Sequence, residues 1–427
     1  MNSPLLGRVP DTTLPRIVDS RKHELIDHTG RRYVDAISGA YAAILGYSPD
    51  SARQAMFAAA SRVPYVHNAR FDTNESLELA ATLSRLSGPE GYSVYFSVSG
   101  ADGVEAALRI ATAYRVARGA KAQHEMACMG YSYHGSTGFA LSATGHAAAR
   151  GVYEPNLKQV RRVDLLSWTY GPKSPQPAWI SDPASIEETL GAQTGAILFE
   201  PMLGNAAGCV EMPDATLASI QSVCKANDIV TIADEISVGS WRCDGLSLAR
   251  SKGMSPDLIV LGKALTAGLF PLSAVLVAPH IVAALGGSVN LLGHTHAAHP
   301  VGCAVALNVV RQVSAPAFQE QMAAMKSRIA LHVRSLGELP VIAAVRGRGA
   351  MYSICLAFQD RRDARGARSG RLYDACLSRG VLVMPGSSVN ERGELVSDHV
   401  TLAPAFNTPD STLDQIFGRL GEAVLAL

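Results

Sequence analysis

Two patterns of apolar residues alternate through the middle of the chain. Short apolar runs, rich in β-branched residues, are separated by longer stretches in which apolar positions recur at helical spacing. The first pattern is typical of buried strands and the second of helices that cover them. The predicted strands are residues 93–97, 125–129, 196–199, 229–233, 258–261 and 273–277. Strands that alternate with helices in this way predict an α/β fold with a mainly parallel sheet and helices on both faces.

The pattern changes after residue 304. A long helical stretch comes first, and short strands are then expected at 343–345, 352–356, 381–384 and 399–402, which indicates a smaller α+β domain. The hairpin-like segment IVDSRKHELIDHTGRRYVDA, near the start of the chain, is expected to pack onto this C-terminal domain. The expected division is an N-terminal segment of 1–45, a large domain of 46–304 and a small domain of 305–427.

The composition favours a globular enzyme over a protein that binds nucleic acid or membranes. The chain has 427 residues, 48% of them hydrophobic and 18% charged, which is enough to bury a large core. Thirty-eight basic against 37 acidic side chains leave no net field that would attract nucleic acid or an anionic membrane. The most apolar stretch, 269–289, is interrupted by prolines and glycines, which argues against a membrane span. The expected partners are small molecules and copies of the chain itself.

The seven cysteines are scattered and form no CxxC pair. This is typical of reduced thiols in a cytosol and not of a zinc site. The beginning of the chain, MNSPLLGRVPDTTLPR, lacks the pattern of a secretory signal. We therefore expect a cytoplasmic protein without a metal site.

Two segments that follow predicted strands are candidates to hold a cofactor. Ser99-Gly100-Ala101 lies between a strand and a helix, where backbone N–H groups can bind a phosphate. Tyr131-Ser132-Tyr133-His134-Gly135 follows the next strand, and an aromatic ring there can stack on a flat heteroaromatic cofactor. Taken alone, a Ser-Gly pair at a strand end is usually a turn, and a tyrosine in such a segment is more often buried in a core.

Two further strand ends carry ionisable side chains. Ala233-Asp234-Glu235 ends the apolar run IVTI, and this puts a carboxylate at the sheet edge where α/β folds bind ligands. Such a carboxylate can pair with a pyridine nitrogen, but a helix N-cap or a metal ligand is an equally good interpretation. Gly262-Lys263-Ala264 follows DLIVL, and its lysine is either a surface residue, the commoner case, or a nucleophilic amine. The functional interpretation depends on all four segments together.

Seven longer segments carry a resemblance to a known family. They are SGADGVEAALRIA, YHGSTGFALSATG, FEPMLGNAAG, ADEISVGSWRCDG, LGKALTAGLFPLSAV, GHTHAAHPVGCAVAL and VRGRGAMYSICL. In order and approximate spacing they resemble the class III aminotransferases of the fold-type I pyridoxal-phosphate enzymes, and in character most of all the ω-amino acid and amine:pyruvate transaminases. The resemblance covers nearly the whole chain. It implies a large domain with a mainly parallel seven-stranded sheet flanked by helices, and a smaller α+β domain from the N- and C-terminal segments.

The resemblance also implies the roles of individual residues. Lys263 would carry pyridoxal 5′-phosphate as an imine, and Asp234 would pair with the pyridine nitrogen. Glu200 would lie close to Asp234 and orient it. Tyr133 would stack on the cofactor ring, and Ile236 would pack on its other face.

Further cofactor contacts are implied at the phosphate end and beside the ring. They come from Ser99, Gly100, Ala101, His134, Gly135 and Thr295. Thr295 would reach the phosphate of the neighbouring subunit. The resemblance therefore implies a homodimer with shared active sites.

The sequence departs from the family pattern where substrate specificity is set. Tyr41 stands where many amine-using relatives have tryptophan, so it is a candidate pocket residue, and 239–242 reads Gly-Ser-Trp-Arg in place of a Gly-Phe-Gly-Arg turn. Relatives that use α-amino acids often have an arginine just before Ala-Pro-Pro, where this chain has Thr401. Arg392 is a candidate to bind the carboxylate of a keto acid instead, although a solvated loop residue is an equally good interpretation.

The sequence thus predicts an aminotransferase that moves an amino group from an amine or ω-amino substrate to a keto acid such as pyruvate. The first alternative is a racemase, epimerase or aminomutase of the same fold. A racemase would need a second base on the opposite face, for which His134 and Tyr41 are conceivable candidates. The second alternative, a non-catalytic cofactor-binding or scaffold protein, is disfavoured because Lys263, Asp234 and Glu200 are all retained.

Overall fold

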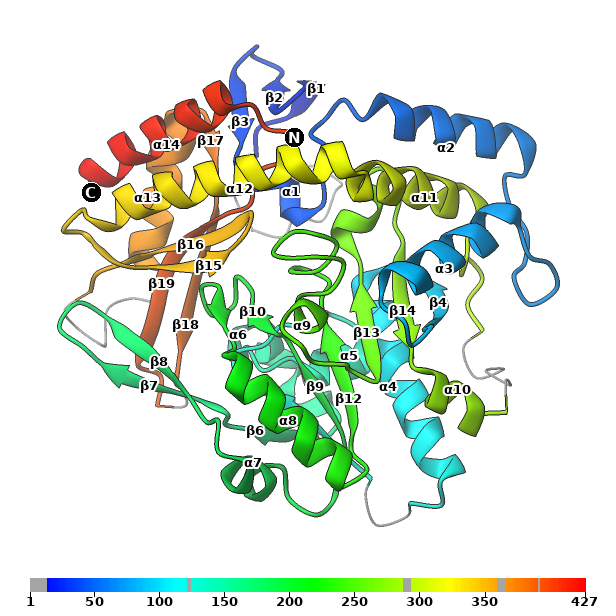
Figure 1. Cartoon of the computed structure of the whole chain (residues 1–427). Coiled ribbons are helices and arrows are strands. Elements are labelled where there is room, and N and C mark those ends of the chain that lie inside the picture. The colour runs from blue at the N-terminus through cyan, green and yellow to red at the C-terminus, as the bar shows by residue number, and fades with distance from the viewer. Residues whose placement is uncertain (1–13, 121–123, 287–292, 359–365, 391) are drawn as a thin grey trace.

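The computed structural model describes residues 14–120, 124–286, 293–358, 366–390 and 392–427. A sheet of seven strands lies at the centre of the fold, and Figure 1 shows helices packed around it. In spatial order its strands are β4 (Ser93–Ser97), β14 (Ser273–Val277), β13 (Leu258–Leu261), β12 (Val230–Asp234), β9 (Thr194–Phe199), β5 (Glu125–Met129) and β6 (Arg161–Val163). β14 runs antiparallel to both neighbours, and the other pairs are parallel. The predicted α/β fold with a mainly parallel sheet is confirmed.

The six strands predicted from apolar runs all form, with ends that differ by no more than two residues. β6 was not predicted, because its sequence Arg-Arg-Val contains no apolar run. Helices cover the sheet: α4 (Gly100–Ala117) packs on β13 and β14, and α8 (Asp214–Ala226) packs on β12. Val104, Leu108 and Ala111 are buried, as expected for one face of α4.

Shorter elements complete the large part of the chain. The helices are α1 (Ser38–Tyr41), α2 (Asp50–Arg62), α3 (Asn74–Leu86), α5 (Gly138–Ala143), α6 (Ala147–Arg150), α7 (Pro183–Leu190), α9 (Leu248–Ser251) and α10 (Pro279–Ala284), with the 3₁₀ turns η1 (Gly151–Asn156) and η2 (Lys263–Thr266). Two antiparallel ribbons pair β7 (Leu166–Tyr170) with β8 (Pro175–Trp179) and β10 (Met202–Leu203) with β11 (Val210–Glu211).

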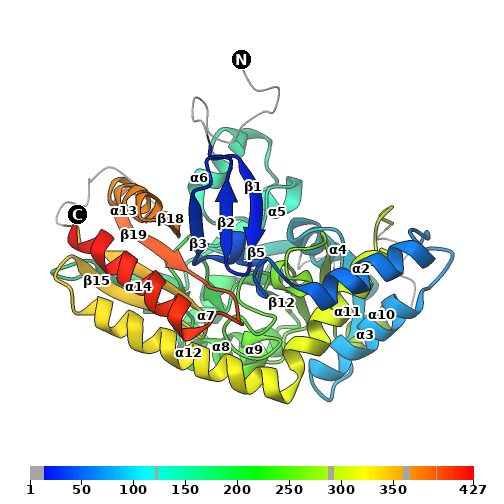
Figure 2. The same ribbon diagram turned by 90° about the horizontal axis from the view of Figure 1, so that it is seen from above.

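The C-terminal part is built on an antiparallel sheet of four strands. Their spatial order is β15 (Ile342–Arg348), β16 (Met351–Leu356), β19 (Leu395–Leu402) and β18 (Met384–Val389). Three helices belong to this part: α12 (Pro316–Gly337), α13 (Ala367–Ser378) and α14 (Asp410–Leu425). α12 and α14 lie alongside each other, as Figure 2 shows.

The N-terminal strands join this part of the fold. β1 (Ile17–Arg21), β2 (Glu24–Asp27) and β3 (Arg32–Asp35) form a meander whose last strand pairs in parallel with β17 (Val381–Leu382). The strand predicted at 381–384 was wrong as a single element. It covers β17 and the first residue of β18, which belong to different sheets, because the apolar run VLVM continues across the point where the chain changes sheets.

The boundary predicted between residues 304 and 305 falls inside α11 (Pro300–Ser314). α11 packs on α2 and α3, whereas α12, which follows after a bend of 71°, packs on α14 and β15. Among the described residues no single helix is long and apolar enough to span a membrane, and only this bent pair of helices meets that test when the two are taken together.

The carboxyl ends of the parallel strands gather at one edge of the central sheet. Ser99 follows β4, Tyr133 follows β5, Glu200 follows β9, Asp234 ends β12 and Lys263 follows β13. Five residues from distant parts of the sequence are thereby brought to the same edge, where the candidate site lies.

Candidate active site

Lys263 follows β13 in a backbone conformation that L residues rarely adopt, with φ +39°. Such strain is characteristic of functional sites. Burial lowers the pKa of the Lys263 amine. Its Nζ lies 2.5 Å from Ser237 Oγ and 5.0 Å from the centre of the Tyr41 ring. A lysine with a lowered pKa is neutral at lower pH than a surface lysine, and a neutral amine is what a nucleophile or a base requires.

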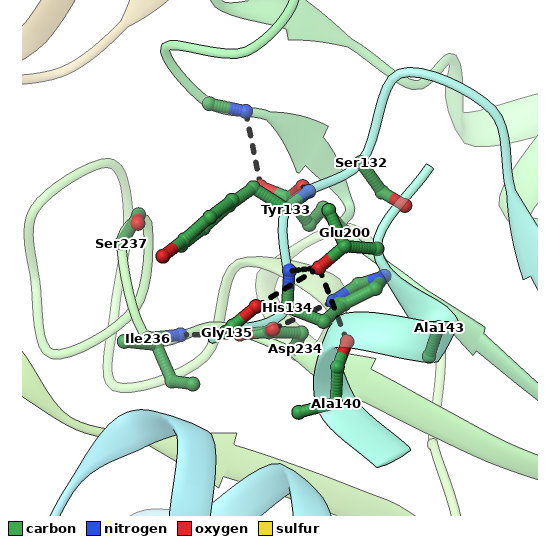
Figure 3. Close-up of polar contacts among 12 residues, drawn as sticks. Ser132, Tyr133, His134, Gly135, Ala140, Ala143, Glu200, Asp234, Ile236 and Ser237 are labelled. Atoms are coloured by element: carbon green, nitrogen blue, oxygen red, sulfur yellow. Dashed lines mark hydrogen bonds and ion pairs between the residues drawn. The ribbon is translucent and has the colours of Figure 1, made fainter. Parts of the chain in front are cut away.

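Asp234 is held at the end of β12 by two contacts (Figure 3). Its Oδ2 lies 2.8 Å from Nδ1 of His134, and its Oδ1 accepts a hydrogen bond of 3.1 Å from the N–H of Ile236. Both Asp234 and His134 are buried. Because an ionised carboxylate only accepts hydrogen bonds, the Nδ1 atom of His134 carries the hydrogen. His134 therefore fixes the orientation of the carboxylate.

Glu200 connects the end of β9 to the segment after β5. Its Oε1 accepts a hydrogen bond of 2.8 Å from the N–H of Tyr133, and its Oε2 accepts one of 3.0 Å from Gly204 (Figure 3). Burial raises the pKa of Glu200 to about 7, and the charge of Asp234 acts in the same direction. Glu200 thus holds in place the backbone of Tyr133, the residue that precedes His134.

The N-terminus of α4 provides the anion-binding end of the site. Ser99 caps the helix: its Oγ accepts a hydrogen bond of 3.2 Å from Asp102 N–H, and its carbonyl accepts one of 2.9 Å from Gly103 N–H. The N–H groups of Gly100 and Ala101 are in the first turn, where an α-helix supplies no acceptor. They are therefore available to an anion, whose charge the helix dipole favours.

Close packing requires two glycines in this cradle. A Cβ atom on Gly100 would lie 2.9 Å from Cδ1 of Ile236, and a Cβ atom on Gly135 would lie 2.6 Å from Cβ of Ala101. Gly135 also has φ +135°, which a larger residue adopts only with strain. Ile236, Ala101 and the two glycines thus form one contiguous wall beside the helix N-terminus.

These residues fit pyridoxal phosphate. A helix N-terminus for the phosphate, a buried amine for the aldehyde and a buried carboxylate for the pyridine nitrogen occur at one sheet edge. The wall that includes Ile236 is apolar, as one face of a flat ring requires. The side chain of Tyr133 is 46% exposed, so this side of the site is open in the single chain.

Thr295 is exposed on the segment that precedes α11. Its carbonyl accepts a hydrogen bond of 3.0 Å from Tyr65 Oη in the same chain. The adjacent His294 has Nε2 3.9 Å from a carboxylate oxygen of Asp102, in the first turn of α4 of the same chain. The prediction that Thr295 reaches the phosphate of a neighbouring subunit remains a prediction.

The structure does not bring Arg392 to Lys263. Arg392 is exposed at the tip of the β18–β19 hairpin, where its N–H donates to Oδ1 of Asn390 at 3.0 Å. Met384, at the other end of β18, packs in the cluster that contains Tyr41. The first and last residues of a six-residue strand are five steps of about 3.3 Å apart, or about 17 Å. Arg392 therefore lies about one strand length from the cluster that contains Tyr41, and its contact is with Asn390; its role as the carboxylate-binding residue stays a prediction.

The departures from the family pattern have distinct structural outcomes. Arg242 is fully buried, and its guanidinium donates to the carbonyl oxygens of Pro404 at 2.7 Å and Tyr41 at 3.2 Å while it faces the ring of Phe406. Burial lowers the pKa of Arg242 to about 10. Thr401 Oγ1 donates to Oδ1 of Asn205 at 2.7 Å. Arg242 therefore joins the segments around Tyr41 and Pro404, and Thr401 belongs to a buried polar network.

Two contacts of the segment after Asp234 were not predicted. Ser237 touches the amine of Lys263, yet a lone serine after Ala-Asp-Glu carries no signal in a single sequence. Glu235 accepts hydrogen bonds from Ser247 Oγ and from the N–H groups of Leu248 and Ala249, at the start of α9. Ser247 is followed by an apolar residue, a pattern typical of a helix N-cap. This pattern is the sequence feature from which the helix start that Glu235 contacts could have been found.

Comparison with known proteins places this site in a family. A family model described as "Aminotransferase class-III" matches residues 9–424. The chain is 25% identical to the uncharacterized aminotransferase YodT of Bacillus subtilis, over 100% of this chain and 98% of that protein. It is 27% identical to the adenosylmethionine-8-amino-7-oxononanoate aminotransferase of Nitratidesulfovibrio vulgaris, over 97% of this chain and 78% of that protein.

Solved structures show the same fold. The PMP-bound aminotransferase of Vibrio fluvialis has a TM-score of 0.86 and 23% identity, over 99% of this chain and 96% of that one. The omega transaminase of Pseudomonas jessenii in complex with PMP has a TM-score of 0.86 and 21% identity, with the same coverage. Since the family model spans almost the entire sequence, the chain belongs to the class-III aminotransferases, which are pyridoxal-phosphate-dependent transaminases.

Proposed function

We propose that this transaminase takes the amino group of an amine or ω-amino substrate and delivers it to a keto acid such as pyruvate. The choice of donor rests on Arg242, whose positive charge acts on the Lys263 amine. Its guanidinium is buried and already donates to backbone carbonyls. A fixed clamp for an α-carboxylate needs a free bidentate fork. Arg242 therefore offers no such fork to either substrate, and the carboxylate of the keto acid would have to be held by other groups.

The residues of the site divide the work of amino transfer. Pyridoxal phosphate, when bound, supplies the electron sink that makes the proton on the substrate's amino-bearing carbon acidic. We assign to Lys263 the attachment of the cofactor and then, as a neutral amine, the movement of that proton. Asp234, oriented by His134, is the group that would keep the pyridine nitrogen protonated. Gly100 and Ala101 would hold the phosphate by their backbone N–H groups.

The two conceivable second bases for a racemase are poorly suited to that role. Nδ1 of His134 is paired with Asp234, and the ring is buried. The Tyr41 hydroxyl is buried, and burial raises its pKa well above 10, so it stays protonated and cannot accept a proton. These two observations support a transaminase over a racemase.

We also propose that the active enzyme is a homodimer in which a second copy covers the open side of the site. The part of the chain that carries α2 and α3 has exposed apolar side chains, which include Phe57, Phe71 and Leu77. Tyr133 and Thr295, both assigned to cofactor binding, are exposed in the single chain. Apolar side chains gathered in one region favour an interface between proteins.

The proposed reaction is tested in its two halves. The purified protein loaded with pyridoxal phosphate is mixed with simple amines, ω-amino acids and α-amino acids in turn, and conversion of the cofactor to its amine form is followed by absorbance. Pyruvate, 2-oxoglutarate and an aldehyde are then added to the product. The proposal expects rapid conversion by amines or ω-amino acids and recovery with a keto acid.

Rapid conversion by α-amino acids alone would contradict the proposed donor class. Interconversion of enantiomers without formation of a carbonyl product would instead identify a racemase. A matched control is Lys263→Ala, which should show neither half of the reaction.

A further inference from the structure

Ser237 lies in the turn after β12, three residues beyond Asp234, on the loop that Figure 3 shows beyond Ile236. Its Oγ lies 2.5 Å from Nζ of Lys263. In the described part of the chain, this is the hydrogen-bond partner that the structure gives to the lysine amine, and no carboxylate forms an ion pair with it. The contact joins the ends of two neighbouring strands, β12 and β13.

The position of the hydroxyl is fixed by the turn that carries it. The N–H of Ile236 donates to Asp234 Oδ1 at 3.1 Å, and the N–H of Gly239 donates to the carbonyl of Glu235 at 2.8 Å. A Cβ atom on Gly239 would lie 2.8 Å from that carbonyl oxygen, so the turn closes this tightly because residue 239 is glycine. Ser237 is thereby held between two backbone hydrogen bonds.

Few other contacts among the described residues hold the amine end of the Lys263 side chain in one direction. A lysine side chain is a flexible four-carbon stem that loses much conformational freedom when it is held in one place. Tyr41 places a ring 5.0 Å from Nζ, and this contact favours the charged amine without fixing its direction. Among the described residues, the directed contact is the one from Ser237.

We propose that Ser237 is a positioning residue that holds the amine of Lys263 beside the reacting carbon after the substrate amine has displaced it from the cofactor. A hydroxyl accepts a hydrogen bond from an ammonium group and donates one to a neutral amine, so it serves both protonation states of the lysine. As a neutral amine Lys263 would take the proton from the substrate carbon, and as an ammonium group it would give the same proton up again, with the bound cofactor supplying the acceptor carbon. Ser237 holds Nζ throughout and exchanges no proton with the substrate.

The chain offers a matched pair of variants for the test. Ser237→Ala removes the hydroxyl, and Ser237→Thr retains it. Ser240→Ala is the control, because Ser240 is a buried serine in the same loop whose Oγ has no hydrogen-bond partner among the described residues. All variants are compared with the unchanged protein by circular dichroism before use.

The first readout uses cofactor-free protein, in which the pH dependence of pyridoxal-phosphate uptake reports the pKa of Lys263. The hydrogen bond to the ammonium form is the stronger of the two because it is charge-assisted, so its loss in Ser237→Ala should lower this pKa by roughly 0.4–1 unit. The second readout is the single-turnover half-reaction with an amine deuterated at the reacting carbon. Ser237→Ala should slow it roughly tenfold with a larger isotope effect and an unchanged KM.

Ser237→Thr and Ser240→Ala should match the unchanged protein in both readouts. The proposal, which rests on the transaminase chemistry of this site, is overturned if Ser237→Ala has the unchanged pKa and rate. It is equally overturned if Ser240→Ala or Ser237→Thr shows the same defect, since the effect then belongs to the packing of the loop. Failure of the unchanged protein to attach pyridoxal phosphate would overturn the cofactor assignment, and this proposal with it.

Discussion

Asp234→Asn tests the charge at the centre of the site, because asparagine keeps the shape of aspartate. The new NH₂ group must replace one of the two oxygens. In place of Oδ1 it would face the N–H of Ile236, donor against donor, at a separation of 3.1 Å. In place of Oδ2 it would face Nδ1 of His134 at 2.8 Å, and that ring would have to move its hydrogen to Nε2.

The second arrangement also has a cost. Nε2 of His134 is buried and has no partner among the described residues, and a buried donor without an acceptor costs about 1–3 kcal/mol. The pairing that the carboxylate would make with a protonated pyridine nitrogen is lost in either arrangement. A hydrogen bond to a charged group contributes about 1.5–3 kcal/mol, so kcat should fall roughly 10- to 150-fold.

The assay measures kcat with an amine and pyruvate, together with the visible absorbance of cofactor bound to Lys263. The account predicts that Asp234→Asn retains this absorbance and loses turnover. His134→Asn is a useful companion, since it should shift kcat in the same direction by less, because the carboxylate charge remains. A kcat close to that of the unchanged protein, with cofactor bound, would refute the role assigned to Asp234.

Three further predictions concern the interface, the buried arginine and the lysine. Mixed dimers of Lys263→Ala and Thr295→Ala subunits should regain activity, because one site then carries both lesions and the other neither; no recovery after proven subunit exchange would place Thr295 in its own chain's site. Arg242→Lys should lower the free energy of unfolding, measured in urea, by about 1–3 kcal/mol, because one ammonium group cannot satisfy all the carbonyls that Arg242 binds. An unchanged urea midpoint and slope would contradict that role of Arg242. Burial lowers the folded-state pKa of Lys263, so between that pKa and 10.5 the unfolded cofactor-free chain binds more protons at this residue, and the contribution of Lys263 to stability should rise with pH across that window. Lys263→Met should remove this contribution, and a variant with the same pH dependence would contradict the burial argument.

The sheet and the order of the site segments were predictable because both follow from local patterns. Runs such as DLIVL, bounded by polar segments, are typical of buried strands, and the segments after parallel strands meet at the carboxyl edge of the sheet. Lys263 and Asp234 could be singled out as strand-end candidates in this way, whereas Glu200 and the roles of all three residues came from the resemblance to the class III aminotransferases.

The remaining features depend on contacts between residues far apart in the sequence. His134 and Asp234 are separated by 100 positions, and no local pattern pairs them. Arg392 looked suitable by its charge and its loop, but the length of β18 decides where it lies. The VLVM run shows the same limit, since apolar character predicts a strand without indicating which sheet it joins.

The central claim is that Lys263 carries the cofactor, and covalent trapping tests it most directly. The protein loaded with pyridoxal phosphate is reduced with borohydride and digested, and the peptides are analysed by mass spectrometry. The account predicts a pyridoxyl-phosphate group on Lys263, and none on the corresponding peptide when the cofactor is omitted. A label on a different lysine, or no label in protein that shows the cofactor's absorbance, would contradict it.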